Sequence, residues 1–263
     1  MKKKNKPRKL LNRKKSDPNV FVFTGQESNA PIEMQLFTYN QTLCDEEKHL
    51  TKLDQLADFN DENLRYWLNV HGLEQAETIS RVCQKLHIHP LVIQDILDIN
   101  QRPKYQEFEH FGFFTLKTII PDDIFVTEQI SFVFGNNYLV SFQERKAVYF
   151  EHIRERLRGN KGIMRSRGLD YLLYTLLESI LDNYFKALEK LETEVDQLHN
   201  RLYTSEASPT TIASIESYKK QALLIKKAML PCKEKYRFEL LSRLRSRVSQ
   251  LSSSVRQRSL SSA

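Results

Sequence analysis

The 263-residue chain contains only seven glycines and three cysteines, and it has no apolar run as long as a membrane span. So few glycines leave little material for a phosphate loop or a dinucleotide-binding turn, and neither motif occurs. Cys44, Cys83 and Cys232 are odd in number and lack metal-ligand spacing, which indicates reduced thiols in a cytoplasm. The basic amino terminus has no apolar stretch after it, which excludes a secretory signal. As written, the chain is expected to be soluble.

The positive charge of the chain is concentrated at its two ends. Residues 1–15 carry nine Lys or Arg and no acid, and residues 238–263 carry five Arg and one Glu. The body between them therefore has a net charge of −6 although the whole chain has +7. A nucleic-acid-binding domain concentrates Lys and Arg on its folded part, with aromatic residues among them. The charge distribution therefore argues against nucleic acid as a partner.

One long helix is predicted from about residue 170 to 203, because its apolar residues alternate strictly at spacings of three and four. This heptad seam consists of Tyr174, Leu177, Leu181, Tyr184, Leu188, Leu191, Val195, Leu198 and Leu202. No Gly or Pro interrupts the pattern, and the face between the seam positions is largely acidic. At 1.5 Å per residue the helix is about 50 Å long, so we expect it to pack outside its own domain or on a partner helix.

A second helix is predicted to return along the first. The SEASP segment is a turn signal, with Ser208 as the N-cap and Pro209 at the first helical position. The heptad alternation then resumes at Ile215, Tyr218, Ala222, Ile225, Met229 and Cys232. Two such helices joined by a short turn form an antiparallel hairpin.

Strands and helices interleave before the long helix. The pattern predicts strands over 19–24, 32–39, 63–70, 104–119, 124–134 and 138–143, and helices over 45–59, 73–86, from Pro90 to about residue 99, and 147–158. This order predicts an α/β domain with an appended helical arm, an α+β chain overall. We therefore divide the chain into a basic disordered arm (1–18), a globular domain (19–165), the hairpin (166–237) and a Ser/Arg-rich tail (238–263) that is expected to fray.

The histidines of the globular part do not form a convincing metal site. His87 and His89 would face the same way on a strand, but no Cys or further His lies at a supporting spacing for zinc. We interpret His89 as the cap of the helix at Pro90 and His87 as a satisfied surface or core residue. No Ser, His and acid arrangement is brought together by the sequence, so the chain is not expected to be an enzyme.

The acidic residues offer a different chemistry. Asp95 and Asp98 are three residues apart, so both carboxylates are expected near one edge of the same helix. Glu178 and Asp182 are one turn apart on the long helix. Hard cations such as Mg²⁺ select oxygen ligands, usually one or two carboxylates with several retained waters. Ordinary solvated acids have the same spacing, so spacing alone does not decide between the two interpretations.

Several blocks resemble the cytoplasmic part of the CorA family of magnesium channels, from about residue 19 to 234. They are HPLVIQDILDINQRPKYQEFE (89–109), VTEQISFVFGNNYLVSFQE (126–144), RERLRGNKGIMRSRGLDYLLYTLLESILDNYF (154–185) and the long helix itself. The resemblance implies an α/β/α sandwich with a mixed sheet followed by long paired helices. It further implies a homopentamer around a pore, with regulatory Mg²⁺ bound between neighbouring cytoplasmic domains.

The resemblance also implies the site residues. In the family's pattern an acidic pair precedes the Ile-Leu of the first block; Asp95 matches the second acid, but Gln94 stands where the first commonly is. This site should therefore be weaker here. Glu178 matches an Asp commonly found on the long helix, and Asp182 completes the predicted metal set. The implied ions are Mg²⁺ and also Co²⁺ or other divalent cations.

Family members continue into a stalk helix, two membrane spans and a Gly-Met-Asn loop, none of which occurs in this sequence. A frameshift, a truncation and a deliberate shortening all fit this pattern. We therefore expect the cytoplasmic portion of an inner-membrane protein, which alone conducts no ions. The predicted function is magnesium sensing and gating in a CorA-type channel. The alternatives are a stand-alone cytosolic regulator that binds partner helices through its hairpin, and a nucleic-acid binder that uses both basic ends together.

Overall fold

The computed structural model describes residues 21–25, 31–50, 58–120, 126–146, 149–204 and 209–231. Its elements are β1 Glu33–Tyr39, β2 Cys44–Leu50, β3 Arg65–His71, α1 Ala76–Lys85, α2 Pro90–Leu97, β4 Lys104–Glu107, β5 Gly112–Ile120, β6 Val126–Phe134, β7 Tyr138–Gln143, α3 Glu151–Arg158, α4 Leu169–Thr204 and α5 Pro209–Pro231. The predicted basic arm, the Ser/Arg-rich tail, Ser208 and Cys232 lie outside these residues. The predicted division of the chain at residue 166 stays a prediction.

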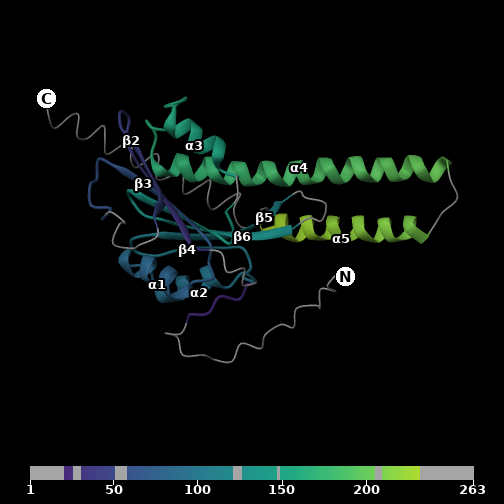
Figure 1. The fold of residues 1–263 in the computed structure, drawn as a ribbon, viewed down its shortest axis with the longest axis horizontal. Helices are drawn as coiled ribbons and strands as arrows, with labels where there is room; N and C mark the ends of the chain where they lie inside the picture. Colours follow the sequence, from purple (N-terminus) through teal and green to yellow (C-terminus); the bar gives the residue numbers. More distant parts are fainter. Residues whose placement is uncertain are drawn as a thin grey trace.

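The seven strands form one mixed sheet in the order β2-β1-β3-β7-β6-β5-β4. Neighbouring strands are antiparallel except β3 and β7, which run parallel at the centre of the sheet. Helices α1 and α2 cover one face, whereas α3 and the first part of α4 cover the other (Figure 1). The arrangement confirms the predicted α/β/α sandwich with a helical arm.

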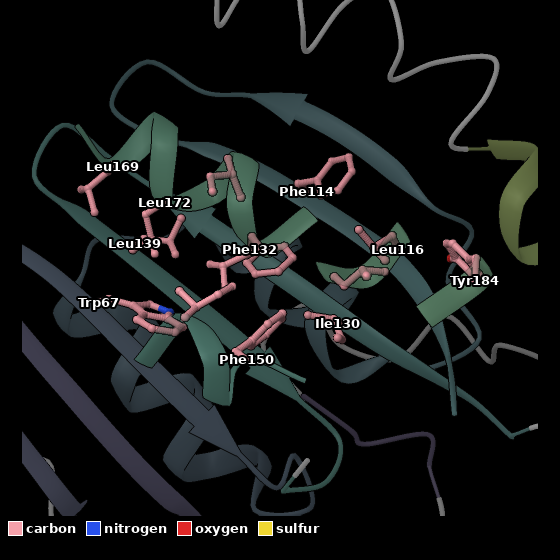
Figure 2. Close-up of a cluster of buried hydrophobic side chains, with 14 of the residues drawn as sticks. Trp67, Phe114, Leu116, Ile130, Phe132, Leu139, Phe150, Leu169, Leu172 and Tyr184 are labelled. Atoms are coloured by element: carbon pink, nitrogen blue, oxygen red, sulfur yellow. The ribbon is translucent and has the colours of Figure 1, made fainter. Parts of the chain in front are cut away.

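Two hydrophobic cores lie on the two faces of the sheet because side chains alternate along each strand. Trp67 and Phe132 point toward α3 and α4, where Phe150 and Leu172 meet them (Figure 2). The next residues along the same strands, Leu68 and Val133, belong to the core under α1 and α2. The central strands are therefore buried on both sides.

The hairpin arm extends beyond the sheet (Figure 1). Helix α4 confirms the predicted long helix within one residue at each end, and α5 begins at Pro209 as predicted. The predicted seam divides into two lines, each with a spacing of seven residues. The buried line contains Tyr184, Leu191 and Leu198. The exposed line contains Tyr174, Leu181, Leu188 and Val195. The buried line packs in the core that α4 shares with the sheet and α5.

The predicted helix over 45–59 is wrong where the structure describes it. Residues Cys44–Leu50 form strand β2, which pairs with β1 alone at the edge of the sheet. Its sequence CDEEKHL is mostly charged, as is common for edge strands that resist further pairing, and this polarity hides the alternation expected of a strand. The leucine spacing after it favoured a helix, and residues 51–57 lie outside the described part.

Two predicted strands also differ from the structure. Residues 21–24 of the predicted strand 19–24 form no ladder; instead the backbone N–H of Thr24 donates to the carbonyl of Leu97 at 3.1 Å. The single strand predicted over 104–119 is two strands, β4 and β5, because the chain turns where Phe108 N–H donates to the carbonyl of Phe111 at 2.8 Å. The predicted helix over 147–158 begins only at Glu151.

Candidate functional site

Helix α2 carries the first predicted metal residue, and its start is fixed by local hydrogen bonding. The Nδ1 atom of His89 accepts from the backbone N–H of Leu91 at 3.2 Å, and Pro90 occupies the first turn. This confirms the predicted cap, and His87 lies exposed on the surface. The buried side of the helix docks on the sheet through Val92, Ile93, Ile96 and Leu97.

Asp95 is buried on this helix and already has partners within the chain. Its carboxylate accepts hydrogen bonds from the side-chain amide of Gln101 and from the Lys104 ammonium, with which it forms a salt bridge. The Asp95 carbonyl accepts from the buried side chain of Gln129 at 3.1 Å. The residue is 8% exposed and both of its carboxylate oxygens have donors, so a cation has to compete with Lys104 and Gln101 for them. Sequence reasoning missed both partners, although they belong to the QRPK block that follows α2.

Asp98 has its own set of hydrogen bonds at the end of α2. It ends α2, and its Oδ1 accepts from the hydroxyl of Thr24 and from the backbone N–H of Asn100, both at 3.1 Å. The Thr24 hydroxyl in turn accepts from Ile99 N–H at 3.0 Å. Asp98 therefore ties the amino-terminal segment to the end of α2. Its carbonyl also accepts from the backbone N–H of Gln101 at 3.0 Å, so Gln101 contacts both Asp98 and Asp95.

Glu178 and Asp182 are exposed on the outer face of α4. The inner face of the helix is fixed to the globular domain by Ser179, whose hydroxyl donates to the carbonyl of Tyr149 at 2.8 Å, and by Tyr184, whose hydroxyl donates to the carbonyl of Lys117. Because these contacts set the rotation of the helix, both carboxylates face away from the sheet. They lie one turn apart, as the sequence predicts.

The structure does not bring the three predicted metal residues together within one chain. Asp95 lies on α2, on one face of the sheet, whereas Glu178 and Asp182 lie on α4, which covers the other face (Figure 1). Within the residues that the structure describes, no three His, Cys, Asp or Glu side chains gather into a metal-binding group. A site that contains all three residues therefore needs more than one copy of the chain.

Sequence reasoning also missed a row of buried polar groups beneath α3. Glu128 is 2% exposed and accepts from the Tyr149 hydroxyl at 2.5 Å and from Arg145 N–H at 2.6 Å. Burial raises the pKa of the Glu128 carboxyl, and the two hydrogen bonds oppose that rise. A signal was available, because the alternation in VTEQISFVF places Glu128 on the same side of β6 as the core residues Ile130 and Phe132.

His71 and Arg154 are further buried polar residues on this side of the sheet. Burial and, second, the positive charge of Arg154 lower the pKa of His71 to about 4. The Arg154 guanidinium donates to Glu151 at 3.0 Å and lies 5.9 Å from the ring centre of Trp67. These groups lie on the α3 side of the sheet and share no contact with Asp95, so we assign them to the stability of the fold.

Comparison with known proteins places this fold in a family. Residues 62–258 match the family described as CorA-like Mg2+ transporter protein. The chain is 31% identical over 230 residues to the cobalt/magnesium transport protein CorA of Thermotoga maritima, which covers 86% of this chain and 65% of that protein. It is 26% identical over 133 residues to the putative metal ion transporter YfjQ of Bacillus subtilis, covering 51% and 41% of the two chains. The chain thus spans less than two thirds of the length of these relatives.

Solved structures share the fold. The complete structure of the CorA magnesium transporter from Methanocaldococcus jannaschii has a TM-score of 0.60 at 21% identity and covers 74% of this chain and 59% of that one. The ZntB cytoplasmic domain from Vibrio parahaemolyticus has a TM-score of 0.58 at 14% identity and covers 77% and 76%. Among the described residues, no helix combines the length and the apolar character needed to cross a bilayer. Members of the matched family are transporters rather than enzymes, and the extent of the match shows that this chain belongs to the CorA-like Mg²⁺ transporter family.

Proposed function

We propose that this chain is the magnesium-sensing, cytoplasmic part of a CorA-type channel for Mg²⁺ and Co²⁺. In this proposal Mg²⁺ bound between neighbouring copies favours the closed ring of five subunits. Membership of the family supports the transport function. The observation that supports sensing between copies is that Asp95 lies on one face of the domain and the Glu178–Asp182 pair on the other. Only two copies can bring these carboxylates together.

The sensing step follows from electrostatics. Carboxylates of adjacent copies repel one another when no cation lies between them, and a divalent cation replaces that repulsion with attraction. Magnesium therefore shifts the equilibrium toward the close-packed arrangement by as much as its binding free energy differs between the two arrangements. In this way the occupancy of the site determines how closely the subunits pack.

The residues present fit a hard cation in their chemistry. Asp95, Glu178 and Asp182 offer only oxygen ligands, which Mg²⁺ prefers, and the exposure of the α4 pair leaves room for retained waters. The ion would supply positive charge between the copies. The Lys104 ammonium supplies positive charge to Asp95 within the chain, so it competes with a cation for the same carboxylate.

The first test replaces Asp95. With Asp95→Ala we expect magnesium-dependent association, and magnesium-dependent protection from proteolysis, to require at least about tenfold more Mg²⁺. Sedimentation velocity and limited proteolysis across a MgCl₂ titration measure both effects. Glu155→Gln, which removes an exposed carboxylate of α3, is the matched control and should respond as the wild type does. An unchanged response of Asp95→Ala in a preparation shown to be pentameric would contradict the proposal.

The second test removes the competitor. Lys104→Gln should lower the half-saturating Mg²⁺ concentration about fivefold, because the cation no longer has to displace a partly buried ammonium from Asp95. A thermal-shift titration with MgCl₂ reads out this change. Lys85→Gln is the control, because it removes another lysine salt bridge, in which Lys85 Nζ lies 3.2 Å from Asp58 Oδ1. It should leave the half-saturating Mg²⁺ concentration unchanged. If Lys104→Gln binds Mg²⁺ no more tightly, Asp95 is not a ligand.

A further inference from the structure

The outer face of α4 carries a line of carboxylates that extends along the arm. All of these carboxylates are exposed. Together with Phe185, which lies between the second and third of them, they follow one another at spacings of three or four residues. We call Glu178, Asp182, Glu189, Glu192 and Asp196 the acidic stripe. By the 3.6-residue period it lies opposite the buried side chains Ala187, Leu191 and Leu198. The acidic stripe therefore faces away from both the sheet and α5, with the exposed line from Tyr174 to Val195 beside it.

The outer face of α5 has the opposite charge. We call its exposed members Lys219, Lys220, Lys226 and Lys227 the basic stripe. They surround Leu223, which is 51% exposed. The opposite side of α5 contains the buried residues Ile225 and Ala228, which pack in the core shared with α4. The basic stripe therefore points away from α4, and the two stripes of one hairpin cannot reach each other.

The two helices have opposite charge, and their charged stripes lie at similar distances from the end of the hairpin. Helix α4 has seven carboxylates and three Lys or Arg, whereas α5 has one carboxylate and four Lys. In the part of the chain that the structure describes, none of the nine side chains in the two stripes takes part in a salt bridge. Measured from the hairpin end, Glu189 to Asp196 lie about 12 to 23 Å along α4, and the basic stripe lies about 15 to 27 Å along α5.

We infer that the part of the acidic stripe from Glu189 to Asp196 on α4 of one copy packs against the basic stripe on α5 of the next copy. The inference rests on the proposed function in taking a second copy as the partner, and it adds which surfaces meet and in which order. A separate acidic or basic partner would satisfy one stripe only, whereas a second copy satisfies both. The contact is head-to-tail, so each copy uses α4 on one side and α5 on the other, as the subunits of a ring do. It also covers the apolar side chains beside both stripes.

Charge reversal tests the contact directly. Glu189→Lys with Glu192→Lys, and separately Lys219→Glu with Lys220→Glu, should each weaken self-association of the full chain about tenfold or more, because like charges then face each other across the interface. A chain with all four substitutions should recover association to within about threefold of the wild type, because the charges are exchanged rather than lost. Sedimentation velocity measures all three. Glu62→Lys with Glu77→Lys changes two exposed carboxylates far from the arm and controls for net charge.

Mixing the two double variants gives a second, independent measurement. Each alone should associate about tenfold or more weakly than the wild type, but an equimolar mixture should associate better than either. In the mixture each lysine-bearing α4 can meet a glutamate-bearing α5, and the wild-type stripes can meet each other. A ring of five keeps one mismatched contact, so the mixture should recover association in part. Raising NaCl from about 50 to about 500 mM should weaken the wild-type contact, since screening shortens the reach of exposed charges. Full association of either double variant alone, or no recovery in the chain with four substitutions, overturns the inference.

The test also separates this inference from the proposed function. The substituted residues exclude Asp95, Glu178 and Asp182, so the magnesium titration can be repeated on each variant. If association changes with the stripes but not with Mg²⁺, the contact stands and magnesium sensing fails. If all variants associate as strongly as the wild type and Mg²⁺ promotes that association, sensing stands and the stripe contact is wrong. A wild-type chain that stays monomeric with and without Mg²⁺ also overturns the stripe contact, and a helix of another protein then becomes the occupant to test.

Discussion

Replacing Trp67 with alanine is expected to lower the free energy of unfolding by about 4 kcal/mol. Trp67 is fully buried at the centre of the sheet, where its ring stacks on Phe37 at 5.4 Å and meets the edge of Phe150 at 6.3 Å (Figure 2). Its indole N–H donates to the hydroxyl of Ser141 at 3.3 Å. The substitution leaves a large cavity between β3 and α3, and the packed neighbours can close it only in part.

Urea and thermal denaturation followed by circular dichroism measure this loss. We expect the midpoint of thermal unfolding to fall by roughly 10 °C. Leu43→Ala is the control, because Leu43 is 50% exposed in the turn between β1 and β2 and should change stability by less than about 1 kcal/mol. A loss for Trp67→Ala no greater than for the control would mean that the α3 side of the sheet is not packed as described.

Acidification is expected to destabilise the protein through His71. Burial and Arg154 lower the pKa of His71 to about 4 in the folded chain, whereas an unfolded histidine titrates near 6.5. As the pH falls through this window, the unfolded chain takes up a proton that the folded chain does not. The stability from the neutral histidine is thus complete above pH 6.5 and is lost progressively toward pH 4, by about 3 kcal/mol.

His71→Gln should flatten the dependence of stability on pH in this window. Equilibrium urea unfolding at a series of pH values between 7 and 4 provides the measurement. The charged groups around His71 are Arg154, Glu33 and Lys146, and the comparison with wild type cancels their own titration to first order. His152→Gln, at an exposed histidine of α3, should keep the wild-type slope. Equal slopes for wild type and His71→Gln would show that the folded chain protonates His71 as readily as the unfolded chain does.

Local signals predicted the helices far better than the edges of the sheet. The long α4 helix and the cap at His89 follow from spacing and from short-range hydrogen bonds, which a single segment encodes. Strand β2 could not be recognised, because this charged segment is extended by its hydrogen-bonded pairing with β1, which the local sequence does not encode. The division of 104–119 into two strands likewise depends on the antiparallel pairing of β4 with β5. Aromatic residues on both sides of the turn made the segment look like one continuous strand.

The sequence named the candidate metal residues but not the side chains that surround them. Asp95 and Glu178 follow from the family resemblance and Asp182 from its spacing one turn after Glu178, and their role as metal ligands stays a prediction. Their surroundings depend on tertiary structure: the Lys104 ammonium reaches Asp95 only because β4 lies beside α2. In the same way, sequence spacing cannot tell the buried line of α4 from its exposed line, since both repeat every seven residues and only the position of the sheet separates them.

The single parallel pairing at the centre of the sheet has a consequence for how the chain folds. Strand β3 pairs with β7, so Trp67 has to find Leu139 after more than 70 intervening residues have been made. Until then, the antiparallel β1–β3 unit leaves the β3 edge open, and the β4–β7 unit leaves the β7 edge open. Closing a loop of this length is slow compared with forming either hairpin unit. During synthesis, the β1–β3 half-sheet would therefore form first and keep its β3 edge open. The nascent chain would be most prone to aggregation until β7 has left the ribosome and paired with β3.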